Sequence, residues 1–449
     1  MRGLRSTILL IVVLGGLGAY IYFVTWKKPE STDIDTKQEK LFAALQADKI
    51  DNLKVKSSSG DMTTLNRAGG GWQVLTPVSA RADEGVVTSI TSNLASTNVT
   101  RVVDDKATDL KSYGLDNPRI DIAFKAPGDK DYRHLLIGEK SPAGDLFVKR
   151  SDDAKVLLIP ASEEAPFNRS TFDLRDKALL RFDREKVDGF DVTAGGKQLQ
   201  FAKAGGDWTI MKPLQARADF STVESLLSKL EGLQMKSVVT AEPTAADLKK
   251  YGLDKPDASV NVNVGSARAT LAVGGKSEDG GLYVRDASKP AVMTVEPTIL
   301  DDLKKSADDF RRKDIFEFRA FDAMHVEFTR NGQTATFDRI KGQGDKPDTW
   351  RRQGAKADIE LDKMDGVLSK LANIRATSFV DAKAKNGLDA PALTVFVKFT
   401  AGSGTKEERV SFGKSGSDTF ASLQGTPGAG KIESADFDDV VKALDEISK

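Results

Sequence analysis

The residues best suited to acid–base or metal chemistry are few in this chain. It has two histidines, His134 and His325, and no cysteine. Without cysteine, thiol nucleophiles, cysteine-bound zinc, iron–sulfur clusters and disulfides are excluded. Each histidine lies in a strand-like segment, and neither has a serine or aspartate nearby in the sequence that resembles a catalytic triad. We interpret both histidines as ordinary side chains on the solvent face of a strand.

Two glycine-lysine-serine segments, Gly274–Ser277 and Gly413–Ser415, resemble the end of a phosphate-binding loop. Such a loop needs another glycine five residues before the glycine-lysine pair, but Thr270 and Glu408 stand there. It must also open a helix, so that backbone N–H groups face the phosphate. Both segments join two strand-like runs, so we interpret them as hairpin turns and expect no bound cofactor.

Acidic and aromatic residues give no clearer site. Asp83 and Asp219 each follow Arg-Ala and precede an amphipathic stretch, where aspartate caps a helix. The 66 acidic residues are too many to single out a pair for glycoside cleavage. Trp72, Trp208 and Trp350 are either sugar platforms or core anchors, and their recurrence beside a turn favours the core. We expect no catalytic, cofactor-binding or metal-binding residue.

The bulk composition describes a balanced, foldable chain. Its 449 residues suggest about three domains of ~150 residues. Hydrophobic residues make up 39%, which is enough to form a core. Lys+Arg and Asp+Glu both number 66 and no basic run stands out, so we expect no nucleic acid partner.

The first forty residues differ from the rest. Thr7–Trp26 contains no charged residue, and a helix of that length spans a bilayer. We predict a transmembrane anchor at residues 7–26, with a cytoplasmic tail at 1–6 and a linker at 27–40. A cleaved signal peptide is the alternative, but no clean cleavage site interrupts the apolar run. The slight excess of positive charge before the helix favours a chain whose bulk lies outside the cytoplasm, periplasmic in location.

The remainder repeats itself three times. Trp72, Trp208 and Trp350 lie 136 and 142 residues apart, and the surrounding motifs keep the same order. The recurring motifs include Tyr113–Pro118, Tyr251–Pro256 and Asn386–Pro391, followed by Ile137-Gly138, Val273-Gly274 and Phe412-Gly413. We therefore predict tandem modules at residues 41–180, 181–316 and 317–449.

The periodicity changes in the same order within each copy. Alternating segments predict short antiparallel strands. Val223, Leu226, Leu227 and Leu230 have the spacing of one apolar helix face. Ser221–Glu224 has the spacing of a capping box, Thr244–Asp247 can begin a second short helix, and Gly252 is placed to end it. The predicted fold class is α+β, an antiparallel sheet with helices in every module.

Six motifs recur in order along the first two copies: Trp72–Pro77, Ala82-Asp83, Tyr113–Pro118, Trp208–Pro213, Ala218-Asp219 and Tyr251–Pro256. Their combination resembles the bacterial DUF4340 family over essentially all of residues 40–449. The third copy departs from the pattern, because Asn386 replaces tyrosine and no proline lies five residues after Trp350.

The resemblance implies anchoring in the cytoplasmic (inner) membrane through residues 7–26, with the repeats outside and ABC-transporter subunits as possible partners. Together with the absence of a convergent histidine, cysteine or metal-spaced cluster, it favours a non-catalytic scaffold or accessory protein of an ABC-transporter or envelope complex. The alternative is a periplasmic binder or hydrolase that acts on envelope polymers.

Overall fold

A computed structural model describes residues 39–381 and 383–447. The chain divides into two compact units, Met1–Lys177 and Ala178–Lys449, which are described separately below. The anchor predicted at residues 7–26 lies outside the described residues. Within 39–381 and 383–447, no helix is long and apolar enough to cross a membrane.

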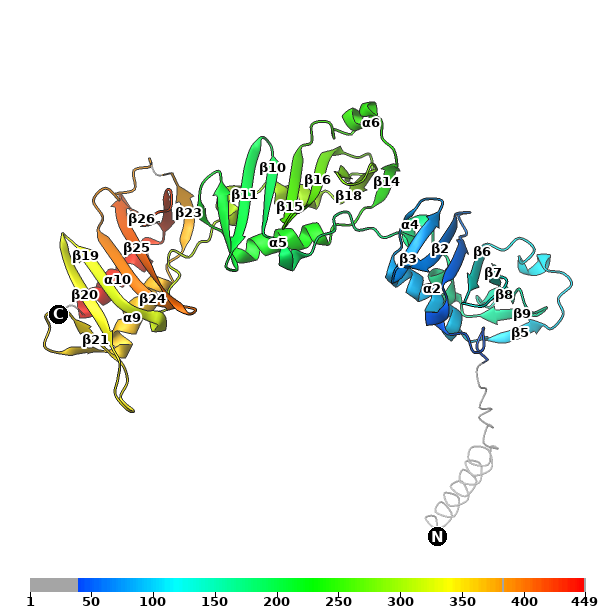
Figure 1. The fold of residues 1–449 in the computed structure, drawn as a ribbon, viewed down its shortest axis with the longest axis horizontal. Helices are drawn as coiled ribbons and strands as arrows, with labels where there is room; N and C mark the ends of the chain where they lie inside the picture. Colours follow the sequence, from blue (N-terminus) through cyan, green and yellow to red (C-terminus); the bar gives the residue numbers. More distant parts are fainter. Residues whose placement is uncertain (1–38, 382, 448–449) are drawn as a thin grey trace, which may run out of the picture. The chain divides into compact units, whose positions relative to one another are not determined.

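The described residues form three nine-stranded antiparallel sheets with one topology, one in the first unit and two in the second (Figure 1). Sheet 1 has the order β4-β3-β2-β1-β6-β7-β8-β9-β5, and sheets 2 and 3 repeat this order with strands β10–β18 and β19–β27. We call the parts of the chain that form sheets 1, 2 and 3 modules 1, 2 and 3. The same topology in all three confirms the predicted tandem repeat and the α+β class.

The strand bounds are as follows. Sheet 1 contains β1 Asn52–Lys56, β2 Met62–Ala68, β3 Gly71–Thr76, β4 Ala80–Arg81, β5 Arg101–Asp104, β6 Ile120–Lys125, β7 Arg133–Lys140, β8 Leu146–Arg150 and β9 Val156–Ile159. Sheet 2 contains β10 Gly189–Ala194, β11 Lys197–Ala204, β12 Asp207–Lys212, β13 Ala216–Arg217, β14 Ser237–Thr240, β15 Ala258–Val264, β16 Ala267–Lys276, β17 Leu282–Asp286 and β18 Val292–Val295. Sheet 3 contains β19 Ala323–Arg330, β20 Gln333–Ile340, β21 Thr349–Arg352, β22 Asp358–Glu360, β23 Ala376–Val380, β24 Leu393–Ala401, β25 Gly404–Ser415, β26 Asp418–Leu423 and β27 Ala429–Ile432.

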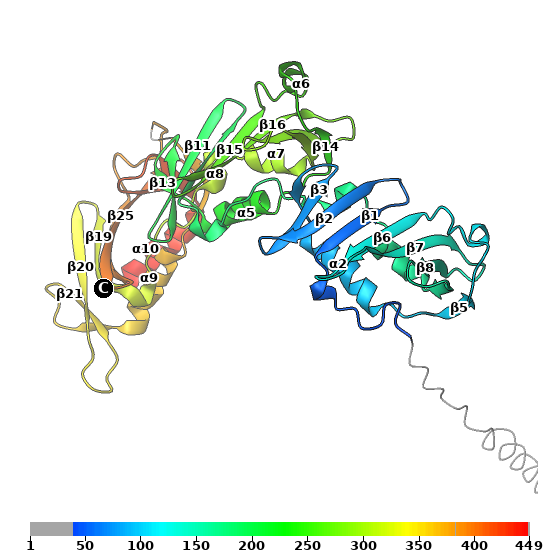
Figure 2. The ribbon, with the colours of Figure 1, turned by 45° about the vertical axis from the view of Figure 1, so that its right-hand side comes forward.

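In each module a long helix connects the fourth strand to the fifth, and one or two further helices follow the ninth strand. The long helices pack their apolar faces on the sheet, and α9 and α10 lie side by side (Figure 2). The α-helices are α2 Glu84–Ser96, α3 Glu164–Phe167, α4 Thr171–Leu174, α5 Phe220–Glu231, α6 Ala245–Lys250, α7 Thr298–Leu303, α8 Ala307–Phe310, α9 Leu361–Ala372 and α10 Ser434–Ile447. The 3-10 turns are η2 Ala47–Lys49, η3 Lys111–Tyr113, η4 Ala161–Glu163, η5 Arg184–Lys186 and η6 Ala320–Asp322.

The start of α5 corrects one sequence interpretation. Ser221 and Glu224 do not form the predicted capping box, because Asp219 is the N-cap residue and accepts from the Thr222 N–H. Glu224 instead accepts a hydrogen bond from Trp208 Nε1 at 3.0 Å. Thr244 does cap α6 as predicted, in a reciprocal capping box with Asp247. Asp219 lies directly before the first residue of α5, so Asp219, and not Ser221 inside the helix, accepts the hydrogen bond at the N-cap.

The paired repetition of the Tyr-Gly-Leu-Asp and Ile/Val/Phe-Gly motifs has a steric cause. Gly252 ends the short helix α6 region with a left-handed φ of +70°. Gly274, on β16, lies directly against the carbonyl of Tyr251, so closely that an added Cβ would clash with backbone. Modules 1 and 3 repeat the contact, with Gly138 against Tyr113 and Gly413 against Asn386. The helix end and the strand therefore fit together only with glycine at the crossing.

The close contact between Gly274 and the Tyr251 carbonyl predicts that a larger residue at position 274 lowers the stability of the chain. Gly274→Ala should destabilise the chain by about 1–3 kcal/mol, because backbone must move to admit the methyl group. Gly275→Ala is the control, since a Cβ at Gly275 would meet Tyr251 O at an ordinary 3.8 Å. Urea unfolding followed by tryptophan fluorescence measures both. Equal effects of the two substitutions would contradict the steric account.

Candidate functional site

Both histidines lie beside carboxylates on neighbouring strands, a pairing that the sequence did not reveal. His134 Nδ1 is 2.9 Å from Asp121 on β6. His325 Nδ1 is 2.7 Å from Asp338, directly across the β19–β20 ladder. A carboxylate can orient an imidazole, but a nucleophile or a convergent third group is also needed for hydrolytic chemistry. No serine, threonine or tyrosine hydroxyl hydrogen-bonds to either ring within the described residues.

The other residues that the sequence singled out have structural roles in the core, at helix ends and in hairpins. Trp72, Trp208 and Trp350 are 1%, 2% and 0% exposed, so they are core residues, as predicted, and cannot stack on a ligand from solvent. Asp83 and Asp219 cap α2 and α5. The glycine-lysine-serine segments end β16 and β25 and lead into hairpins, with no helix following either. Over residues 39–381 and 383–447, no group of three or more His, Asp or Glu side chains is placed to hold a metal ion.

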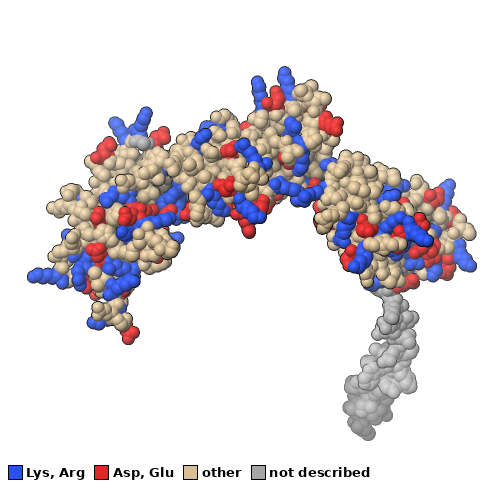
Figure 3. Space-filling model, viewed as in Figure 1, with Lys and Arg blue, Asp and Glu red and all other residues tan. Residues whose placement is uncertain are grey.

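The surface shows no single-sign charge field on the face in view. Lys and Arg side chains are interspersed with Asp and Glu (Figure 3). Four charged residues are buried among those described, and two of them, Arg311 and Glu408, lie where module 2 meets module 3 within the second unit. This junction is the candidate functional site.

A short connector joins the two modules and is anchored in both cores. It begins with α8, whose Ser306 forms a capping box with Asp309. Phe310 is 1% exposed, and its ring lies 5.1 Å from that of Phe201 in module 2. Six residues later Phe316, 2% exposed, packs on Phe318 at 5.2 Å in module 3. The connector is therefore packed at both ends.

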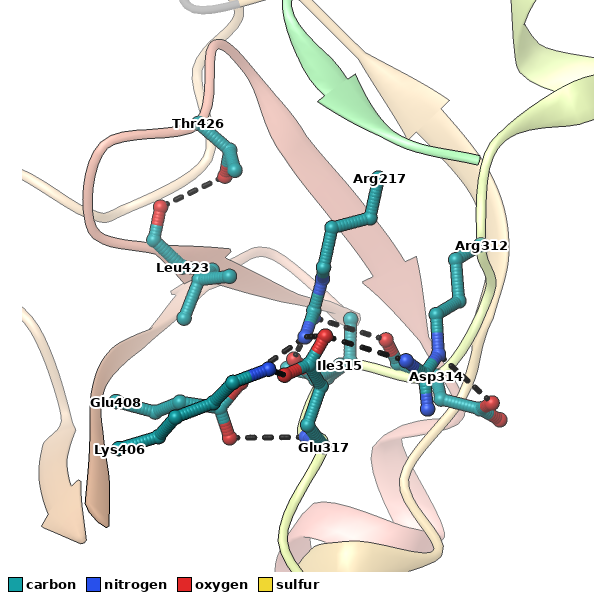
Figure 4. A network of polar contacts seen from close by, with 9 residues as sticks. All are labelled: Arg217, Arg312, Asp314, Ile315, Glu317, Lys406, Glu408, Leu423 and Thr426. Carbon is teal, nitrogen blue, oxygen red and sulfur yellow. Dashed lines mark hydrogen bonds and ion pairs between the residues drawn. The ribbon is translucent and has the colours of Figure 1, made fainter. Parts of the chain in front are cut away.

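Arg217 forms the centre of a charged network across this junction (Figure 4). From β13, its Nη1 donates to Glu408 on β25 at 2.9 Å and lies 3.2 Å from Glu317 of the connector. Its Nη2 donates to the carbonyl of Ile315 at 2.7 Å. Lys406 pairs with the second oxygen of Glu317 at 3.2 Å. Hydrogen bonds to charged groups contribute about 1.5–3 kcal/mol, so this network is a strong link.

The pKa values of the two acids of the network are shifted in opposite directions from their ordinary values. Burial raises the pKa of Glu408, which is 7% exposed, although Arg217 and the Glu317 N–H favour its charged form. Burial also pushes the pKa of Glu317 upward, but Arg217 and Lys406 outweigh it and hold that pKa below its ordinary value. Together with the Glu317 N–H, Arg217 therefore offsets part of the desolvation cost of the Glu408 carboxylate.

An open cleft of about 1310 Å³ lies next to the network, between modules 2 and 3. Module 2 contributes apolar residues of β10 and β11 and the segment after α7, and module 3 contributes the end of β23 and the turn before β27. At its wall Arg311, 8% exposed, stacks on the ring of Phe379 with its guanidinium carbon 3.8 Å from the ring centre. The arrangement offers apolar surface and positive charge together, which suits binding more than catalysis.

Comparison with known proteins supplies the family. The model of the domain of unknown function DUF4340 matches residues 72–212 and 208–391, which together cover more than half of the chain. The chain belongs to the DUF4340 family. No curated protein and no solved structure matches it. The first match of the DUF4340 model starts at Trp72, and the second starts at Trp208 and runs through the junction between modules 2 and 3.

Sequence reasoning missed the junction, although two signals for it were present in this DUF4340 chain. Arg217 lies in an Ala-Arg-Ala-Asp motif that Ala80–Asp83 repeats. The connector from Ser306 to Phe318 also has a counterpart at Ser170–Phe182, with serine, aspartate, arginine, lysine and apolar residues at matching positions. What neither signal could give is the pairing of Arg217 with Glu408, which is 191 residues away.

Removing Arg217 should weaken the junction strongly. Arg217→Met leaves the Glu408 carboxylate buried without its cation. We expect the free energy of unfolding of the second unit to fall by about 2–4 kcal/mol. Glu408→Gln in the same chain should recover part of this loss, giving a non-zero coupling energy. Arg268→Met is the control, since its pair with Asp191 has a 54% exposed arginine and should contribute under about 1 kcal/mol. Purely additive effects at Arg217 and Glu408 would refute direct pairing.

The deficit of Arg217→Met should also depend on pH. Because burial raises the pKa of Glu408, the folded chain binds this proton more readily than the unfolded chain, and stability falls as the pH rises through the folded pKa. Losing Arg217 raises that pKa further. We expect urea unfolding to show a larger deficit at pH 8 than at pH 5, and Glu408→Gln should reduce the difference, because the rest belongs to Glu317, whose pKa Arg217 holds low. A deficit that grows as the pH falls would contradict this assignment.

Proposed function

We propose that this DUF4340 chain is a non-catalytic, membrane-tethered scaffold or accessory protein that works by contact in an ABC-transporter or envelope complex. The observation that carries the proposal is the junction between modules 2 and 3. Arg217 of module 2 pairs with Glu408 of module 3 and donates a hydrogen bond to the Ile315 carbonyl of the connector, and these contacts hold the two modules together. Charged residues used this way hold a surface in a fixed shape, which is what a scaffold requires.

The tether is inferred from the twenty uncharged residues Thr7–Trp26. Positive charge before this segment supports an orientation with the modules outside the cytoplasm. Tethering raises the effective concentration of a partner in the same membrane toward the millimolar range. A weak interface then suffices for function, provided that the anchor is present.

The partner is proposed from the family resemblance, which points to ABC-transporter subunits of the cytoplasmic membrane. The cleft at the module junction favours a second candidate, a periplasmic binder that holds an envelope ligand without a membrane complex. The two differ in one respect that is easily measured, because a diffusible binder does not depend on its anchor.

Anchor exchange tests the scaffold. A chain whose residues 1–26 are replaced by a cleavable signal peptide should lose co-purification with ABC-transporter subunits from solubilised membranes. Replacing the same residues by an unrelated single-span anchor should restore most of it, because proximity is what the anchor supplies. Full co-purification, or full cellular activity, of the anchor-free chain would overturn the scaffold proposal and favour the diffusible binder.

The double variant His134→Ala/His325→Ala tests whether the cellular activity depends on catalysis by a histidine, because it removes both histidines of the chain. A contact scaffold should keep its co-purification and its cellular activity in this variant, since each imidazole pairs only with carboxylates on its own sheet. Loss of cellular activity with folding and abundance unchanged would favour a hydrolase.

A further inference from the structure

The cleft between modules 2 and 3 ends at an incompletely paired sheet edge. β23 is the last strand of sheet 3. The connector pairs with its beginning, where the Ile315 N–H donates to Ile374 at 3.1 Å and the Ala376 N–H donates to Lys313 at 2.7 Å. Beyond Ala376 no described strand pairs with that outer side, and Phe379 and Val380 line the cleft. An open strand edge is a template for another extended chain.

The cleft also carries positive charge that its own acids do not balance. Among the described residues, Lys197 and Lys304 at its rim have no ion pair, and both side chains are exposed. Arg311 is buried at the wall, yet its ion pair to Asp308 is 3.6 Å long and that carboxylate is 53% exposed. Its hydrogen bond to the Pro427 carbonyl is 3.4 Å. Burial lowers the pKa of Arg311, so the loss of hydration outweighs these contacts.

Size and shape favour a polypeptide segment as the occupant. The volume of about 1310 Å³ exceeds the roughly 300–1,000 Å³ typical of small-molecule sites. The apolar walls, formed by Val192, Leu199 and Leu214 opposite Phe379, would take alternate side chains of an extended strand. The cations Lys197, Lys304 and Arg311 would then face carboxylates on that strand.

We propose that this cleft binds an extended acidic segment of a partner protein, which continues sheet 3 along the free edge of β23 and places its carboxylates against Arg311, Lys197 and Lys304. Main-chain hydrogen bonds along the edge give affinity, and the cations select acidic sequences. The inference rests on the proposed scaffold function and names the chemistry of its partner.

Peptide binding to the full chain in nanodiscs of zwitterionic lipid tests it. The probes are fluorescein-labelled peptides of about six residues, a typical strand length, that alternate Glu with Val or Lys with Val. Fluorescence anisotropy should show the Glu-Val peptide binding at least about tenfold more tightly than the Lys-Val peptide, with an affinity that falls as salt rises.

The variants separate the cleft from general surface charge. Lys197→Glu/Lys304→Glu should weaken the Glu-Val peptide by about tenfold or more, and Arg311→Met should also weaken it. The control Lys249→Glu/Lys255→Glu makes the same charge change at exposed positions in module 2, on and just after α6, and should shift the affinity less than about twofold. Because Lys197 and Lys304 are exposed, their substitution does not depend on repacking a core.

Three results would overturn the proposal: equal affinity for both peptides, unchanged binding in Lys197→Glu/Lys304→Glu, or loss of binding in the control. Binding of anionic phospholipid vesicles that needs the same two lysines, without peptide binding, would overturn it in favour of a lipid surface. These failures are separable from failure of the scaffold proposal. A chain that co-purifies with transporter subunits in an anchor-dependent way but binds neither peptide refutes this inference alone.

Discussion

The second unit depends on one short connector that is packed in two cores. Phe310 is held in module 2 and Phe316 in module 3, and each is nearly fully buried. The six residues from one to the other reach at most about 20 Å when fully extended. The two modules cannot move far apart without pulling a phenylalanine out of its core. Withdrawing one would cost about 3–5 kcal/mol, judged from truncations of buried aromatic residues.

The charged network follows from that constraint. Because the connector keeps the modules together, β13 of one lies close to β25 of the other, and Arg217 reaches a glutamate that is 7% exposed. The network links the two modules that form the walls of the adjoining cleft. A cleft whose walls are held in place loses less entropy on binding, which would raise its affinity for the proposed acidic segment.

Features local to one element, and the repeat itself, were readable from the sequence, whereas contacts between different elements were not. The period of Trp72, Trp208 and Trp350 predicted three equal folds, and local capping rules placed Asp219 and Thr244 correctly. Glycine at position 252 predicted a helix end, but its contact with Gly274 needed the fold. The pairs Arg217–Glu408 and His325–Asp338 depend on module packing and strand register, which spacing alone does not encode. The capping box at Ser221 was wrong for a local reason, because Asp219 is the N-cap residue, and Glu224 bonds to Trp208 instead.

The central claim, that modules 2 and 3 form one rigid body held by the connector and Arg217, can be tested by a distance measurement. The chain has no cysteine, so Ser228→Cys on α5 and Ser369→Cys on α9 give two unique, exposed sites for spin labels. Double electron–electron resonance should give a single narrow distance distribution in the otherwise unchanged chain and a broader one after Arg217→Met. A broad distribution before Arg217 is changed, or an equally narrow one afterwards, would contradict the claim.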